Sequence, residues 1–209
     1  MTVRANQRLR TRKELLRAAA RLVAEGRKPS LDEVAEAALV SRATAYRHFP
    51  NIDALLLEAA LDLAAPGAED VFPPDAPTDI TARALMVDAA LHDMVAQNEP
   101  LMRTFLANAL LQGGGGGGDG DALTRQNRRT PLIQSAIEPS RDRLSPRERK
   151  MLERALALIV GGEAILICRD VLQLGDAETR EVKRWAIRAL VTAALENTRT
   201  KRAAAKSGD

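Results

Sequence analysis

Apolar positions recur at helical spacing along nearly the whole chain, and this pattern predicts an all-α protein of about nine helices. The first expected helix spans residues 7–25, with an apolar stripe on one side and arginines on the other. Gly26 and Pro29 are expected to end it. The further expected helices cover residues 31–38, 42–49, 52–64, 79–97, 99–112, 122–137, 145–172 and 177–198.

Local signals support these boundaries and divide the chain into two domains. Ser30 with Glu33, and Ser145 with Glu148, have the spacing of a capping box at a helix start. The proline-rich segment 65–78 indicates a boundary loop. We therefore expect a first domain at residues 1–50, a linking helix at 52–64, and a second domain at 65–209.

The most informative segment is residues 30–56, which predicts two short helices around a tight turn, followed by a third. On a helical wheel for residues 42–49, Ala45 and Phe49 face the core. The opposite face and its flanks carry the candidate DNA-binding residues Arg42, Ala43, Thr44, Tyr46, Arg47 and His48. Arginine can bind guanine with two hydrogen bonds, and a small apolar side chain can contact a thymine methyl group. Tyr46 and His48 lie where the phosphates along the groove walls would be. The alternative is a helical hairpin whose polar face is only solvated.

Charge is distributed unevenly, and it favours the same end of the chain. Residues 1–50 contain eleven lysines and arginines against five acidic residues, whereas the rest contains twenty against twenty-three. A basic module on a mildly acidic body is typical of nucleic-acid binding proteins. A solvated basic arm would show the same imbalance, so charge alone does not decide.

Composition argues against several other classes of protein. No apolar run reaches the 20 or so residues that a membrane span needs, and we expect that the amino-terminal residues are not a secretory signal, because no apolar segment follows their charges. The single cysteine, Cys168, excludes an internal disulfide, and we expect a cytoplasmic protein. The glycine run at 113–120 lacks the lysine and strand of a phosphate-binding loop, and we expect a mobile loop. No nucleophile–base pair, carboxylate pair or metal cluster is visible, so we expect no enzyme, no metal and no cofactor.

Residues 8–60 resemble the DNA-binding domain of the tetracycline-repressor (TetR) family. The resemblance is carried by three segments, LLRAAARLV, VAEAALVS and TAYRHFPNIDALL. It implies a nine-helix fold in which three or four helices bind DNA and the rest bind a ligand and dimerise. It also implies that Arg42, Ala43 and Arg47 face bases, while Thr44, Tyr46 and His48 hold phosphates.

The chain departs from the family pattern at two positions. Leu39 replaces the glycine of the turn, so the turn either takes a left-handed conformation at a cost near 1 kcal/mol or changes shape. Ile52 replaces the lysine that opens the fourth helix, so one phosphate contact is expected to be missing. Four arginines of the amino-terminal arm could compensate: Arg4, Arg8, Arg10 and Arg12.

The second domain is expected to dimerise and to bind an unknown small-molecule effector. Helices 145–172 and 177–198 are the expected dimerisation pair, because the first is apolar on many sides and both carry small residues such as Gly161, Gly162 and Ala189. Trp185 and Cys168 are interpreted as packing residues. The candidate pocket residues are Met86, His92, Met94, Met102, Phe105, Leu106 and Glu163. Glu163, if buried, needs a partner such as an arginine or a cationic ligand, and an ion pair at the dimer interface or within the chain is the simpler reading.

Three functional hypotheses follow from the sequence. The first is a homodimeric, ligand-responsive transcriptional regulator, most often a repressor, that binds a near-palindromic double-stranded DNA operator. The second is an enzyme, for which no site is visible. The third is a helical module of the same fold that binds a ligand or a protein and has weakened DNA binding, with Leu39 and Ile52 as its signs.

Overall fold

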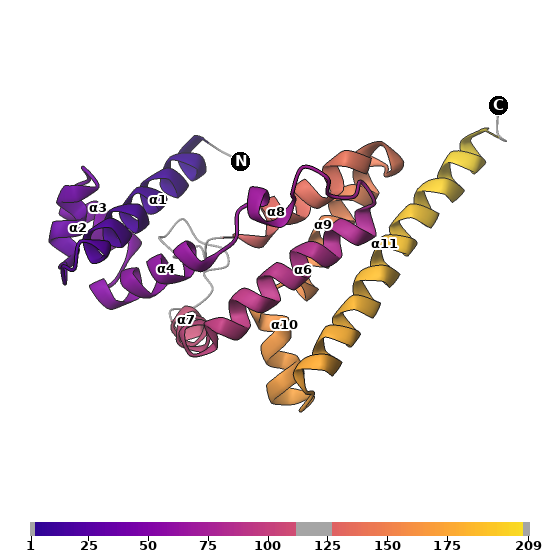
Figure 1. Ribbon diagram of the computed structural model, residues 1–209. Helices are drawn as coiled ribbons and strands as arrows, with labels where there is room; N and C mark the ends of the chain where they lie inside the picture. Colours follow the sequence, from indigo (N-terminus) through magenta and orange to yellow (C-terminus); the bar gives the residue numbers. More distant parts are fainter. Residues whose placement is uncertain (1–2, 112–126, 207–209) are drawn as a thin grey trace. The chain divides into compact units, whose positions relative to one another are not determined.

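The computed structural model describes the backbone of residues 3–111 and 127–206, and the side chains of residues 7–110 and 127–200. Over these residues the protein is all-α, as predicted, with no strand (Figure 1). The chain forms two compact units. The first takes residues 1–65 and 98–126, and the second takes residues 66–97 and 127–209.

The first unit is built on a three-helix amino-terminal module. The module consists of α1 (Val3–Ala24), α2 (Leu31–Ala37) and α3 (Arg42–His48), and the unit also contains α4 (Ile52–Ala64) and α7 (Glu99–Leu111). Helix α1 packs against both α2 and α4, and α4 also packs against α7. The core is formed by fully buried side chains from all of the first four helices, among them Leu15, Val34, Ala45 and Leu55.

The second unit contains the remaining helices around a separate core. They are α5 (Ala68–Val71), α6 (Ile80–Gln97), α8 (Arg129–Ile137), the 3-10 helix η1 (Glu138–Arg143), α9 (Pro146–Ile159), α10 (Gly162–Leu166), the π-helix η2 (Ile167–Val171) and α11 (Asp176–Lys206). Helix α8 packs between α6 and α9, and α11 packs along α9 and α6 (Figure 1). Ile133, Leu156 and Ile187 are among the fully buried residues of this core.

The helix starts predicted from capping residues are confirmed. The Ser30 hydroxyl accepts from the Glu33 amide at 3.2 Å, and the Glu33 carboxylate accepts from the Ser30 amide at 2.7 Å. The hydrogen bonds that the Ser30 amide and hydroxyl donate to the Glu33 carboxylate lower the pKa of Glu33. The Ser145 hydroxyl accepts from the Glu148 amide at 3.2 Å, which starts α9 where the sequence indicated. Each cap satisfies amides that have no partner within the helix.

The single helix expected at residues 145–172 is wrong, because the chain breaks at Val160 and Gly161. Val160 is extended, and Gly161 has a φ of 132°, which L side chains rarely adopt. A Cβ atom on Gly161 would lie 3.0 Å from the guanidinium carbon of Arg129. That guanidinium donates to the Ala157 carbonyl at 2.8 Å and binds both carboxylate oxygens of Glu163 at 2.7 and 2.6 Å. Gly161 therefore makes room for an arginine that joins the two sides of the break.

The segments between domains differ in part from expectation. The compact units divide after Ala65, at the start of the proline-rich segment, and this segment contains the short helix α5. Helix α7 belongs to the first unit, although the sequence pattern placed residues 99–112 in the second domain. The expected loop at 113–120 and the start of the helix expected at 122–137 lie outside the described residues. Among the described helices, none combines the length and the apolar character needed to cross a bilayer.

Candidate nucleic-acid interface

Helices α2 and α3 form the helix-turn-helix, and α3 is fixed at its start and on its inner side. The Ser41 hydroxyl caps α3 by accepting from the Thr44 amide at 3.2 Å. Ala45 and Phe49 are buried in the core of the first unit, as the helical wheel predicted. Because one side of α3 is buried, its other side must face outward from this core.

The turn before α3 keeps a left-handed residue although it lacks the usual glycine. Leu39 has a φ of 57°, so the first of the two alternatives at this position is the observed one. The Val40 amide donates to the Ala35 carbonyl, and the Leu39 amide donates to the Glu36 carbonyl, both at 3.0 Å. This pair of bonds is the Schellman arrangement that ends many helices. The Leu39 side chain is 94% exposed, so no packing compensates for the strained backbone.

The six predicted DNA-binding residues lie on α3 away from the core. Arg42, Ala43, Tyr46 and Arg47 are exposed, whereas Thr44 and His48 are half-buried. The Thr44 hydroxyl forms a hydrogen bond of 2.8 Å with the Ser41 hydroxyl at the cap. The face therefore presents two guanidinium groups, one small side chain and one phenol to the outside.

The two arginines of this face differ in their surroundings. Arg42, which is exposed, forms an ion pair at 3.2 Å with the half-buried Asp32 of α2. Arg47 forms no ion pair with any residue that the structure describes. Because a salt bridge between exposed groups contributes little free energy, Asp32 restrains Arg42 only weakly.

The start of α4 keeps its side-chain cap, although its first residue is an isoleucine. The Asn51 side chain caps α4 by accepting from the Ala54 amide at 2.8 Å. Ile52 is half-buried and packs against the core of the first unit. The residue that replaces the family's lysine therefore contributes to packing, and the capped amides remain at the helix start.

The amino-terminal arginines do not form one group, and the expectation for Arg12 is wrong. Arg12 is only 8% exposed, and its side chain is bound by groups of α3 and α4, so it is not available to a phosphate. Arg8 and Arg10 are exposed on α1. The side chain of Arg4 lies outside the described residues. Sequence reasoning missed Arg12 because the helical wheel of α1 alone does not show which arginine meets another helix.

The candidate pocket residues fall in both compact units. Met102, Phe105 and Leu106 lie on α7 in the first unit, whereas Met86, His92 and Met94 lie on α6 in the second. Glu163 lies on α10, also in the second unit, and forms the ion pair with Arg129 described above. His92 is fully buried, and its Nε2 lies 2.9 Å from Asp176 at the start of α11. Both polar members of the predicted set therefore already have partners in the chain.

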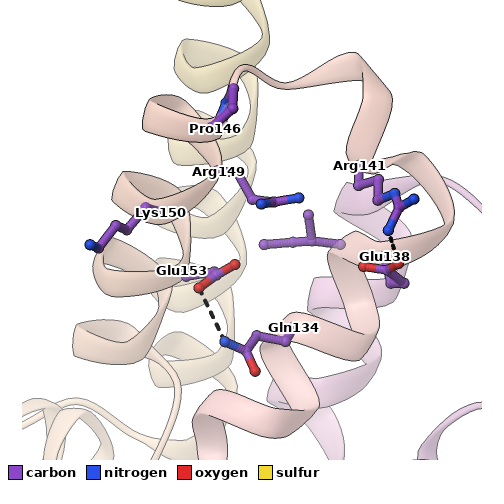
Figure 2. Close-up of a pocket in the computed structure, with 8 residues that line it drawn as sticks. Gln134, Glu138, Arg141, Pro146, Arg149, Lys150 and Glu153 are labelled. Carbon is purple, nitrogen blue, oxygen red and sulfur yellow. Dashed lines mark hydrogen bonds and ion pairs between the residues drawn. The ribbon is translucent and has the colours of Figure 1, made fainter. Parts of the chain in front are cut away.

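A polar hollow of about 660 Å³ lies elsewhere in the second unit, between α8, η1 and the first turns of α9 (Figure 2). Arg149 extends into this hollow, whereas Lys150 points away from it (Figure 2). The carboxylate of Glu138 binds Arg141 at 2.8 Å, and that of Glu153 accepts from Gln134 at 3.3 Å. The hollow shares no residue with the predicted pocket.

Large apolar side chains are exposed on the second unit, and they gather on the helices expected to dimerise. They are Met151 and Leu158 on α9, Ile167 and Val171 on η2, Leu172 directly after it, and Val182 and Trp185 on α11. Trp185 is 72% exposed, so the interpretation of Trp185 as a packing residue within the chain is wrong. Cys168 is buried, as that interpretation expected.

Comparison with known proteins agrees with the geometry of the first unit. Residues 15–59 match the family model of the bacterial regulatory proteins of the tetR family. No curated protein and no solved structure matches the chain significantly. The matched residues run from the middle of α1 into α4 and contain the whole helix-turn-helix with its outward face. Residues 15–59 are therefore similar to the DNA-binding domain of the tetR-family regulators, and the similarity covers the helix-turn-helix and the helices that support it.

Proposed function

We propose that the protein is a homodimeric, ligand-responsive repressor that binds a near-palindromic operator in cytoplasmic DNA. The observation that carries this proposal is the outward face of α3. There, a helix capped at its start and buried on its inner side presents Arg42, Ala43, Tyr46 and Arg47 together. A short cationic helix with a buried inner side is the element that helix-turn-helix proteins place in the major groove.

The residues of this face divide into base contacts and phosphate contacts. Arg47 and Arg42 are proposed to bind guanines, and Ala43 to contact a thymine methyl group. Arg42 must first exchange Asp32 for DNA, whereas Arg47 has no partner to leave among the described residues. Arg47 is therefore the residue on which operator discrimination should depend most.

The phosphate contacts are assigned to Thr44, Tyr46 and His48, on or beside the outward face. Such contacts fix the orientation of the protein on the duplex and carry no sequence information by themselves.

Dimerisation is proposed through α9 and α11. Their exposed apolar residues include a tryptophan, a residue type that is enriched at the centres of protein interfaces. On α11, Val182, Trp185 and Ala189 are exposed at the spacing of one helical stripe. Two copies joined by a two-fold axis would carry two α3 helices, which is why the operator should be nearly palindromic.

The effector is proposed to be a largely apolar molecule held in part by the half-buried methionines of α6, Met86 and Met94. A charged effector is not favoured, because Glu163 and His92 already bind Arg129 and Asp176. Methionine side chains adapt their shape and fill irregular spaces, which suits an apolar ligand. Ligand would favour a conformer in which the two α3 helices are wrongly spaced for the operator.

The alternative, a module of the same fold with weakened DNA binding, rests on the departures at Leu39 and Ile52. Leu39 keeps the left-handed turn, and Ile52 packs in the core, so neither departure distorts the helix-turn-helix. A module that does not bind DNA would also leave the two exposed arginines on the outward face of α3 without a function.

Selection of duplexes from a random double-stranded DNA library by the full chain tests the proposal. We expect enrichment of two inverted half-sites centred about 10–10.5 base pairs apart, or a multiple of this, as a two-fold pair of recognition helices requires. Enrichment of no sequence would contradict the proposed operator binding. Enrichment of a single half-site would contradict the proposed dimer alone.

A further inference from the structure

Arg12 of α1 has all three guanidinium nitrogens bound inside the first unit. Its Nε donates to Glu58 Oε1 at 2.8 Å, and its Nη2 donates to Glu58 Oε2 at 2.5 Å. Its Nη1 donates to the backbone carbonyl of His48 at 2.9 Å. One side chain of α1 thereby binds both α4, through Glu58, and the last residue of α3.

The carbonyl that Arg12 binds is one that the recognition helix leaves without a helical partner. Phe49 is extended, with φ −139° and ψ 126°, and Pro50 follows it, so α3 cannot continue past His48. The last carbonyls of any helix lack amide partners and need a donor from elsewhere. A cation at this end is also favoured by the helix dipole.

The same guanidinium also packs against the aromatic ring beside this carbonyl. The Arg12 guanidinium carbon lies 4.2 Å from the centre of the Phe49 ring, a cation–π distance. Arg12 is 8% exposed, Glu58 3% and Phe49 1%, so the whole cluster is shielded from water. Only a planar fork with donors in several directions can make these contacts at once, which a lysine cannot.

We propose that Arg12 is a positioning residue for the recognition helix: it sets the carboxyl end of α3 against α1 and α4, and operator discrimination depends on it although it touches no DNA. This inference rests on the proposed function of α3 as the reader of the operator. Arg47 and His48 lie at the end that Arg12 holds, and a shift of this end moves their side chains relative to the base edges.

This role is separable from stability. A buried ion pair adds little net stability, because the cost of removing both charges from water offsets their attraction, and apolar replacement of both partners is often neutral. The double variant Arg12→Met/Glu58→Met removes both charges and also the bond to the His48 carbonyl. It should fold, yet leave the end of α3 without its donor.

The test compares this double variant and the milder Arg12→Lys with the control Arg17→Met, which removes an exposed cation from the same helix. Each full-length protein is titrated with the duplex that the wild type enriches from a random library, and with a scrambled duplex, over a range of salt concentrations. Unfolding in urea is measured for each variant, and hydrogen exchange is followed at the amides of α3.

In both Arg12 variants we expect the ratio of the affinity for the enriched duplex to the affinity for the scrambled duplex to fall about fivefold or more. A fivefold fall is about the smallest effect expected from the loss of one base contact. The control should keep the ratio. The salt slope of each Arg12 variant should stay close to the wild-type slope, since Arg12 itself binds no phosphate. An unchanged ratio in the double variant would overturn the proposal. So would a slope reduced by about 0.9 for each subunit, because Arg12 would then bind a phosphate.

Hydrogen exchange separates this proposal from the proposed function. If the wild type enriches no duplex, operator binding by α3 fails, and the exchange of the Ala45 and Phe49 amides still decides whether Arg12 holds α3. These amides close the helix by donating to Ser41 and Ala45. Exchange at least several-fold faster in both Arg12 variants than in Arg17→Met supports the positioning role, and equal exchange overturns it.

Discussion

Leu39 shows how a single residue can depart from a family pattern without changing the local structure. Its φ of 57° is close to ideal left-handed geometry, and the two Schellman bonds of the turn are present. The sequence left two outcomes open here, because the strain on a leucine and the demand of the turn oppose each other. The structure resolves them in favour of the turn.

Leu39→Gly should therefore stabilise the protein. Glycine takes the left-handed conformation without the strain that leucine bears, and the leucine side chain is 94% exposed and buries almost nothing. We expect the free energy of unfolding to rise by about 1 kcal/mol in urea titration. Ala38→Gly is the matched control, because Ala38 has right-handed geometry at φ −89° and should lose stability. A loss of stability in Leu39→Gly would mean that the leucine makes a contact absent from this fold.

At the scale of the elements, the sequence predicts helix starts well and breaks within helices poorly. The caps at Ser30, Ser41 and Ser145 act within three residues of chain, so their spacing is visible in the sequence. The break at Gly161 depends on Arg129, which is distant in sequence and reaches the site only in the folded unit. Because this contact is not visible in the sequence, the sequence analysis interpreted Gly161 as a small residue that allows close helix packing.

Buried polar contacts between α6 and α11 were equally invisible to pattern analysis. His92 binds Asp176 across 84 residues of sequence. Lys183, which is 2% exposed, lies 2.7 Å from Asp88. On α11 the buried residues include Ile187 and Val191, whereas Val182 and Trp185 are exposed, so which side of the helix is buried depends on the partner helix.

The His92 contact gives the stability of the protein a defined dependence on pH. Burial lowers the pKa of His92 below its ordinary value of 6.5, and nearby Lys183 and Arg180 act in the same direction, against the hydrogen bond to Asp176. The unfolded chain therefore takes up a proton near pH 6.5 that the folded protein takes up only at lower pH. Stability is complete above about pH 6.5 and falls as the pH decreases below it, by at most about 1.4 kcal/mol per pH unit.

Urea unfolding between pH 5 and 8 measures this dependence. His92→Asn should flatten the curve below pH 6.5, whatever its effect on absolute stability. The chain has one other histidine, His48, and the same measurement on His48→Asn separates the contribution of that residue from the contribution of His92. If the dependence of stability on pH survives in His92→Asn and disappears in His48→Asn, the titrating group is His48 of α3, and this account is contradicted.

For the whole molecule, the exposed apolar residues of α9 and α11 predict association through the second unit. Trp185 is the only tryptophan of the chain, so its fluorescence reports on this surface alone. We expect its emission to shift to shorter wavelength as the protein concentration rises and Trp185 becomes buried between copies. Val182→Glu should abolish the shift and give the mass of a monomer in sedimentation.

The control for this change places the same charge on another exposed apolar residue. Leu63 of α4 is 80% exposed, and Leu63→Glu should leave both the emission shift and the mass of the dimer unchanged. Emission independent of concentration, together with a monomeric wild type, would exclude dimerisation through α11.

The outward and buried residues of the helix-turn-helix could be predicted from the sequence, whereas the side-chain contacts between its helices could not. The cationic helix-turn-helix, its buried Ala45 and Phe49, and its six outward or flanking residues follow from helical periodicity alone. Arg12 does not, because its role depends on Glu58 and His48, which lie 46 and 36 residues away. Periodicity shows which side of a helix is buried, and only the fold shows what lies opposite that side.

The most direct test of the central claim is the affinity of Arg47→Ala for the enriched duplex and for a scrambled duplex of the same length. Because the arginine is proposed to bind a guanine, the ratio of the two affinities should fall by about 1–3 kcal/mol in free energy. Tyr46→Phe, which removes only a proposed phosphate contact, should weaken both affinities alike. If Arg47→Ala keeps the wild-type ratio, α3 does not read the operator, and the proposed function is contradicted.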